Sequence, residues 1–152
     1  EFIEYGEDLS KNTVANAQSF AAALAAEGFD VLAESRGYTA SHQVLTRHGE
    51  LDSGAGAKAA DLLERAGIIT NMNMLPGDTK AMTPSGLRLG VQELTRVGMG
   101  PTEMEEVAKL YGRVLIHGED PASVKASVSA LKGEFQTIRY CFNEDEISGY
   151  PL

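Results

Sequence analysis

Arg88 is the residue whose type and spacing most favour chemistry in this sequence. It stands between Leu87 and Leu89 in a run that reads as a β-strand, and side chains along a strand alternate between its two faces. If both leucines pack into a core, Arg88 must face water, a partner or a ligand. A guanidinium presents a planar fork of donors that matches a carboxylate or a phosphate. Taken alone, however, the pattern favours an ordinary surface arginine.

Two glycines and two asparagines surround this arginine in the sequence. Gly86 and Gly90 carry no side chain, so another backbone or a small ligand can approach the strand closely. If a strand predicted for Ile68–Thr70 continues, Asn71 and Asn73 share one face. An asparagine amide both donates and accepts, so it can orient a heterocyclic ring or a carboxylate without adding charge. Asparagine is also common in turns.

The segment between the asparagines and Arg88 reads as a loop from Leu75 to Pro84, with a turn at Pro76-Gly77-Asp78. A loop of this length beside a site often closes over a ligand, and it can equally serve as a simple connection.

Other candidate sites are weaker. His42 stands at a strand entrance, where a lone histidine is more often structural than catalytic. Gly54-Ala55-Gly56 before a helix could cradle a phosphate, but it lacks the Lys-Ser/Thr of a P-loop, which favours a flexible loop. The single cysteine, Cys141, excludes an internal disulfide, and the three histidines show no metal-ligand spacing. We therefore predict no metal site.

The charge of the chain argues against two classes of partner. The formal net charge is -9, and no cluster of Lys and Arg appears. Nucleic acid and anionic membrane surfaces bind clustered basic residues, so neither is expected as a partner. No signal peptide and no spanning apolar run is visible, which predicts a cytoplasmic location.

The periodicity predicts a long N-terminal helix and a mixed α/β fold. Apolar residues recur at helical spacing from Glu4 to Glu27, and Gly28 stands where a helix C-cap belongs. Further helices are expected over 59–66, 101–117 and 121–132, and strands over 29–32, 43–46, 68–70 and 87–91. These elements predict a two-layer α+β domain, with an antiparallel sheet of about three main strands and helices on one side. Residues 95–100 read as a linker in which Arg96 is a candidate for an ion pair.

Several motifs together resemble a known family. The run Ser85–Gly90, with Thr95–Met99 behind it and Asn71–Asn73 ahead, resembles the C-terminal domain of serine hydroxymethyltransferase. The similarity extends over the first hundred-odd residues, through segments at 4–7, 28–31, 41–44 and 64–68. We therefore expect residues 1–132 to form a C-terminal small domain, and residues 133–152 to be an extension that forms a short strand or an arm.

The resemblance implies a fold-type I pyridoxal-phosphate enzyme that interconverts serine and glycine with a tetrahydrofolate-type carrier. It assigns Arg88 to the α-carboxylate of the amino acid and Asn73 to the pterin of the carrier, with His42 and Asn71 as further candidates. In the family the Schiff-base lysine lies in a large domain, and no lysine here has the expected neighbours. The resemblance thus implies no catalytic residue in this chain, an inactive isolated chain, and as partners its own large domain and the second subunit of a homodimer.

The identity of the one-carbon carrier and two alternatives to a hydroxymethyltransferase stay open. Val91-Gln92 stands where many members have Thr-Pro, and Gly77 replaces a bulkier residue, which leaves the identity of the one-carbon carrier undecided. A related pyridoxal-phosphate aldolase or transaldolase that acts on threonine or α-methylserine would share Arg88, because every amino-acid substrate has an α-carboxylate. The third interpretation is a non-catalytic interaction module.

Overall fold

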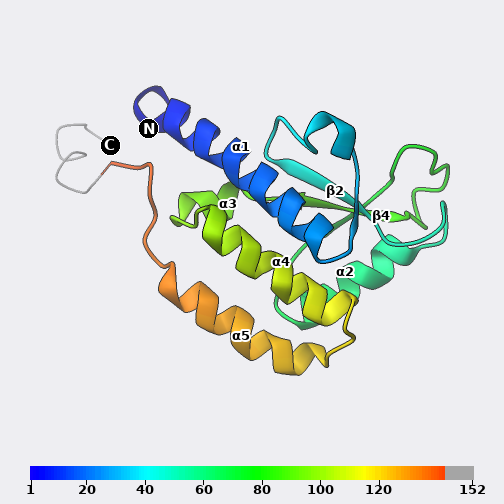
Figure 1. The fold of residues 1–152 in the computed structure, drawn as a ribbon. Coiled ribbons are helices and arrows are strands. Elements are labelled where there is room, and N and C mark those ends of the chain that lie inside the picture. The colour runs from blue at the N-terminus through cyan, green and yellow to red at the C-terminus, as the bar shows by residue number, and fades with distance from the viewer. Residues whose placement is uncertain (143–152) are drawn as a thin grey trace.

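A computed structural model describes residues 1–142 of the chain. The first element is the predicted long helix, α1, which spans Phe2–Ala26 (Figure 1). It ends as the sequence predicts: Gly28 has a φ of 97°, and the N–H of Phe29 donates to the carbonyl of Leu24 at 3.0 Å. This left-handed glycine and backward hydrogen bond are the usual way in which a helix stops.

Four strands form one antiparallel sheet. They are β1 (Asp30–Val31), β2 (Gln43–Arg47), β3 (Asn71–Asn73) and β4 (Gly86–Gly90), in the spatial order β1-β2-β4-β3. β4 therefore lies inside the sheet, between β2 and the edge strand β3. The predicted antiparallel sheet is confirmed, with four strands.

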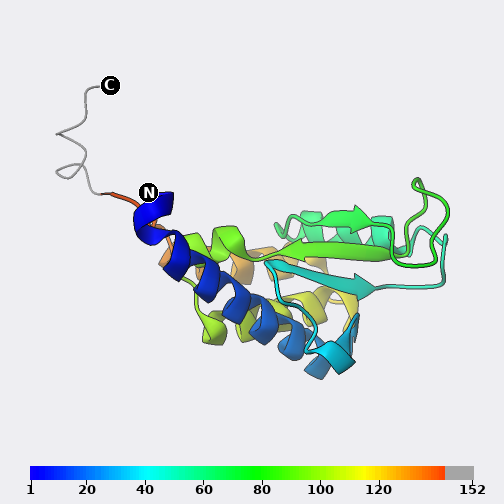
Figure 2. The same ribbon diagram turned by 90° about the horizontal axis from the view of Figure 1, so that it is seen from above.

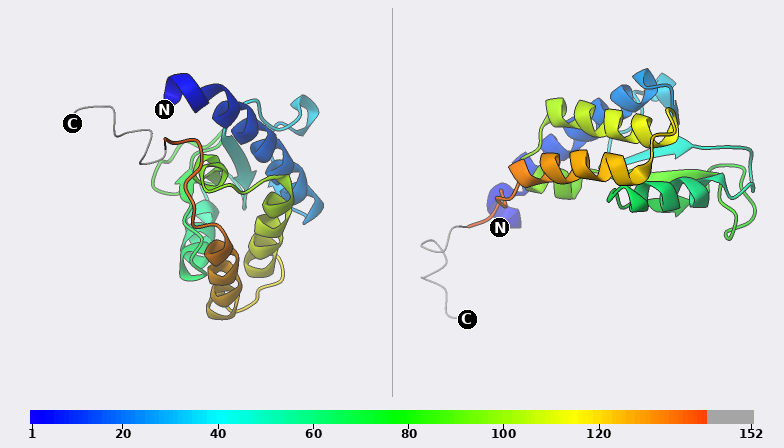
Figure 3. Two further views of the ribbon diagram at one scale, coloured as in Figure 1. Left: turned by 90° about the vertical axis from the view of Figure 1, so that its left-hand side faces the viewer. Right: turned by 90° about the horizontal axis from the view of Figure 1, so that it is seen from below.

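The helices lie on one side of this sheet. They are α2 (Ala55–Arg65), the short α3 (Gln92–Arg96), α4 (Pro101–Leu115) and α5 (Pro121–Glu134), with a 3-10 turn η1 at Glu34–Arg36. Figure 2 looks onto the open face of the sheet, and the right-hand view of Figure 3 looks from the helix side. α5 packs on α2 and α4 rather than on the sheet. The predicted α+β fold with helices on one side of an antiparallel sheet is confirmed, and α5 lies outside the helices that pack on the sheet.

The core lies between the sheet and the helices. Leu87 and Leu89 of β4 are buried, with 0% and 3% of their surface exposed, and they join one cluster with Leu24 of α1, Leu63 of α2 and Met104 of α4. Since side chains alternate along a strand, Arg88 projects from the opposite face. It is exposed, as the sequence predicts.

Two local predictions were wrong. Residues 68–70 are not a strand, because the chain leaves α2 through Gly67 (φ 80°) and the N–H of Ile68 bonds back to the carbonyl of Leu63 at 2.9 Å. Pairing begins only at Asn71, where Arg88 becomes the partner. The predicted linker at 95–100 starts inside α3, which five residues are too few to reveal by periodicity. Arg96 does form an ion pair, with Glu1 at 3.0 Å.

The segment after α5 runs back to the N-terminal half of α1 as an arm without helix or strand, as far as the described residues go. The side-chain amide of Asn12 donates to the hydroxyl of Tyr140 at 2.8 Å, and the rings of Tyr5 and Phe142 meet edge to face with centroids 5.4 Å apart. The rest of the predicted extension, 143–152, lies outside the described residues. The predicted boundary at residue 132 stays a prediction.

Replacing Gly56 with alanine is expected to lower the free energy of unfolding by at least about 2 kcal/mol, because overpacking against main chain cannot relax as a side chain does. A Cβ on Gly56 of α2 would overlap the backbone of Gly86 in β4. Thermal or denaturant unfolding measures the effect. Gly133 in α5 is the matched control, since its Cβ would meet open space. Gly133→Ala should be neutral or stabilise by up to about 1 kcal/mol, and equal effects of both variants would contradict this account of the α2–β4 contact.

Candidate functional site

A cavity of about 800 Å³ lies at the end of the sheet where β4 leads into α3. Its lining combines the end of β4 and the start of α3 with residues 67–71, the start of β2, and residues of α1, α4 and α5. Arg88 belongs to this lining. The predicted arginine therefore opens onto a concave surface large enough for a small ligand.

The opening follows from a length mismatch between two strands. β3 begins at Asn71, which pairs with Arg88, whereas β4 continues to Gly90. Leu89 and Gly90 consequently pair with β2 on one side and have no β3 residue on the other. The chain before Asn71 diverges from the sheet, and the cavity occupies the corner that this leaves.

The Arg88 side chain has no ion pair and no hydrogen bond with any residue in 1–142. Arg47, by contrast, pairs with Asp30 at 3.3 Å, and Arg113 pairs with Glu119 at 2.8 Å. A guanidinium without a partner keeps its donors available, and it carries full charge at any pH at which proteins fold. Arg88 can therefore bind an anion without first breaking a contact within this part of the chain.

The structure separates the two asparagines. Asn71 is exposed, lines the cavity and lies directly opposite Arg88 on the neighbouring strand. Asn73 pairs with Gly86, is not part of the lining, and donates its side-chain amide to the carbonyl of Met74 at 2.6 Å. Its Oδ1 has no partner among residues 1–142. The structure thus brings Asn71, and not Asn73, beside Arg88.

His42 and two glutamines also belong to the polar part of the lining, together with Thr70, Glu93 and Lys132. His42 is exposed just before β2, and its carbonyl accepts the N–H of Val91 at 3.3 Å. Gln43 and Gln92 also line the cavity, and the Gln92 amide covers the side of Gly90 where a Cβ would be. Sequence reasoning missed both glutamines. The alternation of polar Gln43 with buried Val44 was a usable signal, but only the pairing of β2 with β4 places Gln43 on the Arg88 face.

Another part of the chain packs closely against Gly86, one of the two glycines near Arg88. A Cβ on Gly86 would overlap the side chain of Leu75, which comes from the loop before β4 and is buried. Close packing of the loop, rather than a bound ligand, accounts for the glycine at this position.

The Gly54–Gly56 segment is not a phosphate cradle. The N–H groups of Gly54 and Gly56 donate to the carbonyls of Thr83 and Pro84 at 3.0 and 3.1 Å, and the N–H of Ala55 donates to the hydroxyl of Ser53 at 3.3 Å. Amides that already have internal acceptors are unavailable to an anion. The segment instead ties α2 to the loop before β4.

Two aspartates hold that loop in place. Asp78 accepts the N–H groups of Asp52, Leu75 and Ser85 and the hydroxyl of Ser85, at 2.7 to 3.0 Å. Asp52 in turn accepts the N–H groups of Thr79 and Lys80 and the hydroxyl of Thr79, at 2.7 to 2.8 Å. This pair, the Asp52–Asp78 clasp, makes the loop a fixed connection whose Leu75 supports the strand that carries Arg88.

The clasp shifts both carboxyl groups toward the charged form. Partial desolvation raises the pKa of Asp78, but hydrogen bonds from main-chain N–H groups and from Ser85 outweigh it and leave this pKa far below its ordinary value. The hydrogen bond from Thr79 is the main cause of the lowered pKa of Asp52. Both carboxylates therefore stabilise the folded state only while they are ionised.

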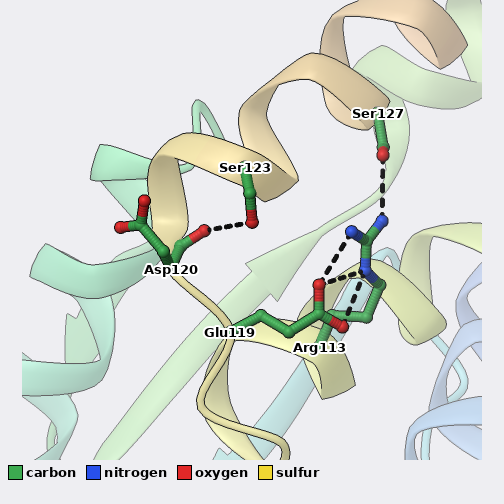
Figure 4. Close-up of polar contacts among 5 residues, drawn as sticks. All are labelled: Arg113, Glu119, Asp120, Ser123 and Ser127. Atoms are coloured by element: carbon green, nitrogen blue, oxygen red, sulfur yellow. Dashed lines mark hydrogen bonds and ion pairs between the residues drawn. The ribbon is translucent and has the colours of Figure 1, made fainter.

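The wall formed by α5 is fixed to α4 by one arginine. Arg113 donates to both carboxylate oxygens of Glu119, at 2.8 to 3.1 Å, and its remaining terminal nitrogen donates to the hydroxyl of Ser127 at 2.9 Å (Figure 4). Such a fork-to-carboxylate pair restrains orientation as well as distance. It holds the turn between α4 and α5, and with it the far side of the cavity.

No group of three His, Cys, Asp or Glu side chains in residues 1–142 could hold a metal ion. Within the same range, every helix is too short or too polar to cross a membrane.

Comparisons with known proteins identify the family. The family model described as serine hydroxymethyltransferase matches residues 1–111, most of the chain. The chain belongs to the serine hydroxymethyltransferase family. A serine hydroxymethyltransferase from Thermococcus kodakarensis is 50% identical over 154 aligned residues, and one from Pyrococcus furiosus is 50% identical over 145. These alignments cover 100% and 94% of this chain.

The chain corresponds to only part of each serine hydroxymethyltransferase. It spans 35% of the Thermococcus protein and 34% of the Pyrococcus protein. Among solved structures, an L-threonine transaldolase from Pseudomonas fluorescens has a TM-score of 0.82 and 28% identity, and the match covers 95% of this chain and 33% of that one. The resemblance read from the sequence, a C-terminal portion of this family, is therefore confirmed.

Pyridoxal phosphate is the cofactor associated with this family. Lys132 is the one lysine in the cavity lining, and it is exposed on the last turn of α5. A lysine that forms a Schiff base is usually activated by desolvation or by a neighbouring cation, and neither condition is met here.

Because of the Asp52–Asp78 clasp, we expect the stability of the folded state to fall at acid pH. Because the pKa of Asp78 is lowered on folding, its stabilisation is complete above the unfolded pKa of about 3.9 and is lost as the pH falls below that value. Asp78→Asn should lower the midpoint of thermal unfolding at pH 7, since an amide cannot accept all four hydrogen bonds, and the difference from wild type should shrink between pH 5 and pH 3.

Thermal unfolding across this pH range measures the effect. Asp61→Asn serves as the control, because Asp61 is an exposed residue of α2 whose side chain has no hydrogen bond or ion pair with any other residue in 1–142. A wild-type advantage over Asp78→Asn that stayed constant down to pH 3 would contradict the role given to the ionised carboxylate.

Proposed function

We propose that this chain is the C-terminal domain of a pyridoxal-phosphate-dependent hydroxymethyltransferase that interconverts serine and glycine with a tetrahydrofolate-type carrier. Within that enzyme, Arg88 binds the α-carboxylate of the amino acid. The observation that carries the proposal is the exposed guanidinium at the cavity, which has no partner within residues 1–142, in a chain that belongs to this family.

The position of Arg88 on an inner strand suits the binding of a carboxylate in one fixed orientation. Its backbone is held on both sides, by Leu45 of β2 and by Asn71 of β3, so the base of the side chain is fixed. A guanidinium grips a carboxylate through two parallel N–H···O bonds, which sets the orientation of the amino acid as well as its position. Holding a substrate in the reactive orientation can contribute several kcal/mol to lowering the barrier.

The remaining parts of the site are proposed to come from outside this chain. The family's large domain would supply the cofactor site and its Schiff-base lysine, and a second subunit of a homodimer would complete the pocket. The isolated chain is then inactive, and the enzyme works in the cytoplasm. Asn73 would meet the one-carbon carrier through its Oδ1, since its amide nitrogen already bonds to Met74, and His42 would lie at the rim of the pocket.

A second candidate function has its own support. The structural neighbour with a TM-score of 0.82 is an L-threonine transaldolase, and an enzyme of that kind also needs a cation for the α-carboxylate. Cleavage of threonine without any folate-type carrier, at a rate above that of serine conversion with the carrier, would favour this alternative for the enzyme that carries this chain.

Replacing Arg88 with lysine in the complete enzyme should weaken binding of serine and glycine by about a hundredfold, because a lysine offers a point charge in place of the two-pronged fork. Binding of pyridoxal phosphate should change little. Titration of the amino acid by calorimetry, with the cofactor content measured by absorbance, separates the two.

Arg65→Lys is the matched control, because Arg65 is an exposed arginine of α2 outside the cavity. It should bind serine as the unmodified enzyme does. If Arg88→Lys also kept full affinity, the assignment of the carboxylate to Arg88 would be wrong.

A further inference from the structure

Asn71 and Arg88 form a hydrogen-bonded pair across two strands. The N–H of Val91 donates to the carbonyl of His42, and the N–H of His48 donates to the carbonyl of Ser85, so odd-numbered residues of β4 direct their main-chain groups to β2. Arg88 therefore directs its N–H and carbonyl to Asn71, its partner in the register. In such a pair the Cα atoms lie about 5.5 Å apart and both side chains project from one face.

Both side chains are free to reach one ligand. Each is exposed and lines the cavity, and neither has a hydrogen bond or ion pair with any residue in 1–142. The cavity reaches them because β3 begins at Asn71, so nothing from that strand covers the corner beyond it. The Arg88 guanidinium and the Asn71 carboxamide belong to directly paired residues, so both can face the cavity.

We propose that Asn71 is a second binding residue for the anion held by Arg88, and that its side-chain N–H donates to the same carboxylate. This inference rests on the proposed function of Arg88 and adds a residue to that site. It differs from the role proposed for Asn73, whose side chain lies beside Gly86 and bonds to Met74.

The chemistry of the pair explains why an amide suits this position. The guanidinium of Arg88 donates two hydrogen bonds to a bound carboxylate. The carboxylate oxygens can still accept hydrogen bonds from further donors. An amide N–H adds one of these without changing the net charge of the site. A carboxylate at position 71 would instead pair with Arg88 and repel the substrate anion. Asn71 therefore favours ligands with a negative group.

The test replaces Asn71 with aspartate, which is nearly the same shape, in the complete enzyme. Calorimetry measures the dissociation constants of glycine and of glycinamide, which lacks the negative carboxylate. Asn71→Asp should weaken glycine binding by about a hundredfold and Asn71→Ala by about tenfold. Glycinamide binding should change by less than about threefold in both, because no carboxylate is present to be lost or repelled.

Met72→Asp is the matched control. It adds the same charge one residue along β3, and Met72 is 49% exposed, lies outside the cavity lining and projects from the other face of the sheet. Its affinity for glycine should stay within about twofold of the unmodified enzyme, as expected for a charge that is screened by solvent.

The outcomes separate this inference from the function on which it rests. If Asn71→Asp weakens glycine no more than Met72→Asp does, while Arg88→Ala abolishes the preference for glycine over glycinamide, the inference is overturned and the function of Arg88 stands. If Arg88→Ala also keeps that preference, both fail. Equal losses for glycine and glycinamide in Asn71→Asp would indicate a structural role and would also overturn the inference.

Discussion

The pairing of β4 with a strand on each side is the constraint on which the rest of this structure depends. It buries Leu87 and Leu89 against the helices and forces the residue between them to the opposite face. The cost of exposing two leucines makes any slip of the register by one residue unfavourable. The outward direction of Arg88 is therefore a consequence of hydrophobic burial, and the site inherits its rigidity from the core.

The elements around β4 serve to keep this strand in position. α2 approaches it closely at Gly56 and Gly86, where no side chain separates the two backbones. On the other face, the loop held by the Asp52–Asp78 clasp places Leu75 against Gly86. Helix and loop thus clamp the start of β4 from both faces, while its other end stays open at the cavity. This arrangement leaves room for a ligand beside Arg88 and Gly90.

The function proposed for this chain would divide one site between two domains. The chain covers 35% of the length of its Thermococcus relative, and Arg88 and Asn71 bring two groups of hydrogen-bond donors to its cavity. A division in which one domain holds the substrate's charged group and another holds the cofactor lets the two be brought together when substrate binds. Such a division fits the exposed position of the cavity in this domain.

Much of this could be predicted from the sequence. Local signals are sufficient for α1 and its glycine stop and for the alternation that turns Arg88 outward, because each depends on residues close together along the chain. The family could be predicted because several short motifs follow one another in the family's order. The start of β3, the short α3 and the place of Gln43 and Gln92 could not be predicted, since they depend on which strands pair and where pairing ends. The distinction between Asn71 and Asn73 is of this second kind. The sequence by itself determined that both asparagines share one face, and only the register with β4 decided which of them lies beside Arg88, because contacts across a sheet are set by the partner strand and not by neighbours in sequence.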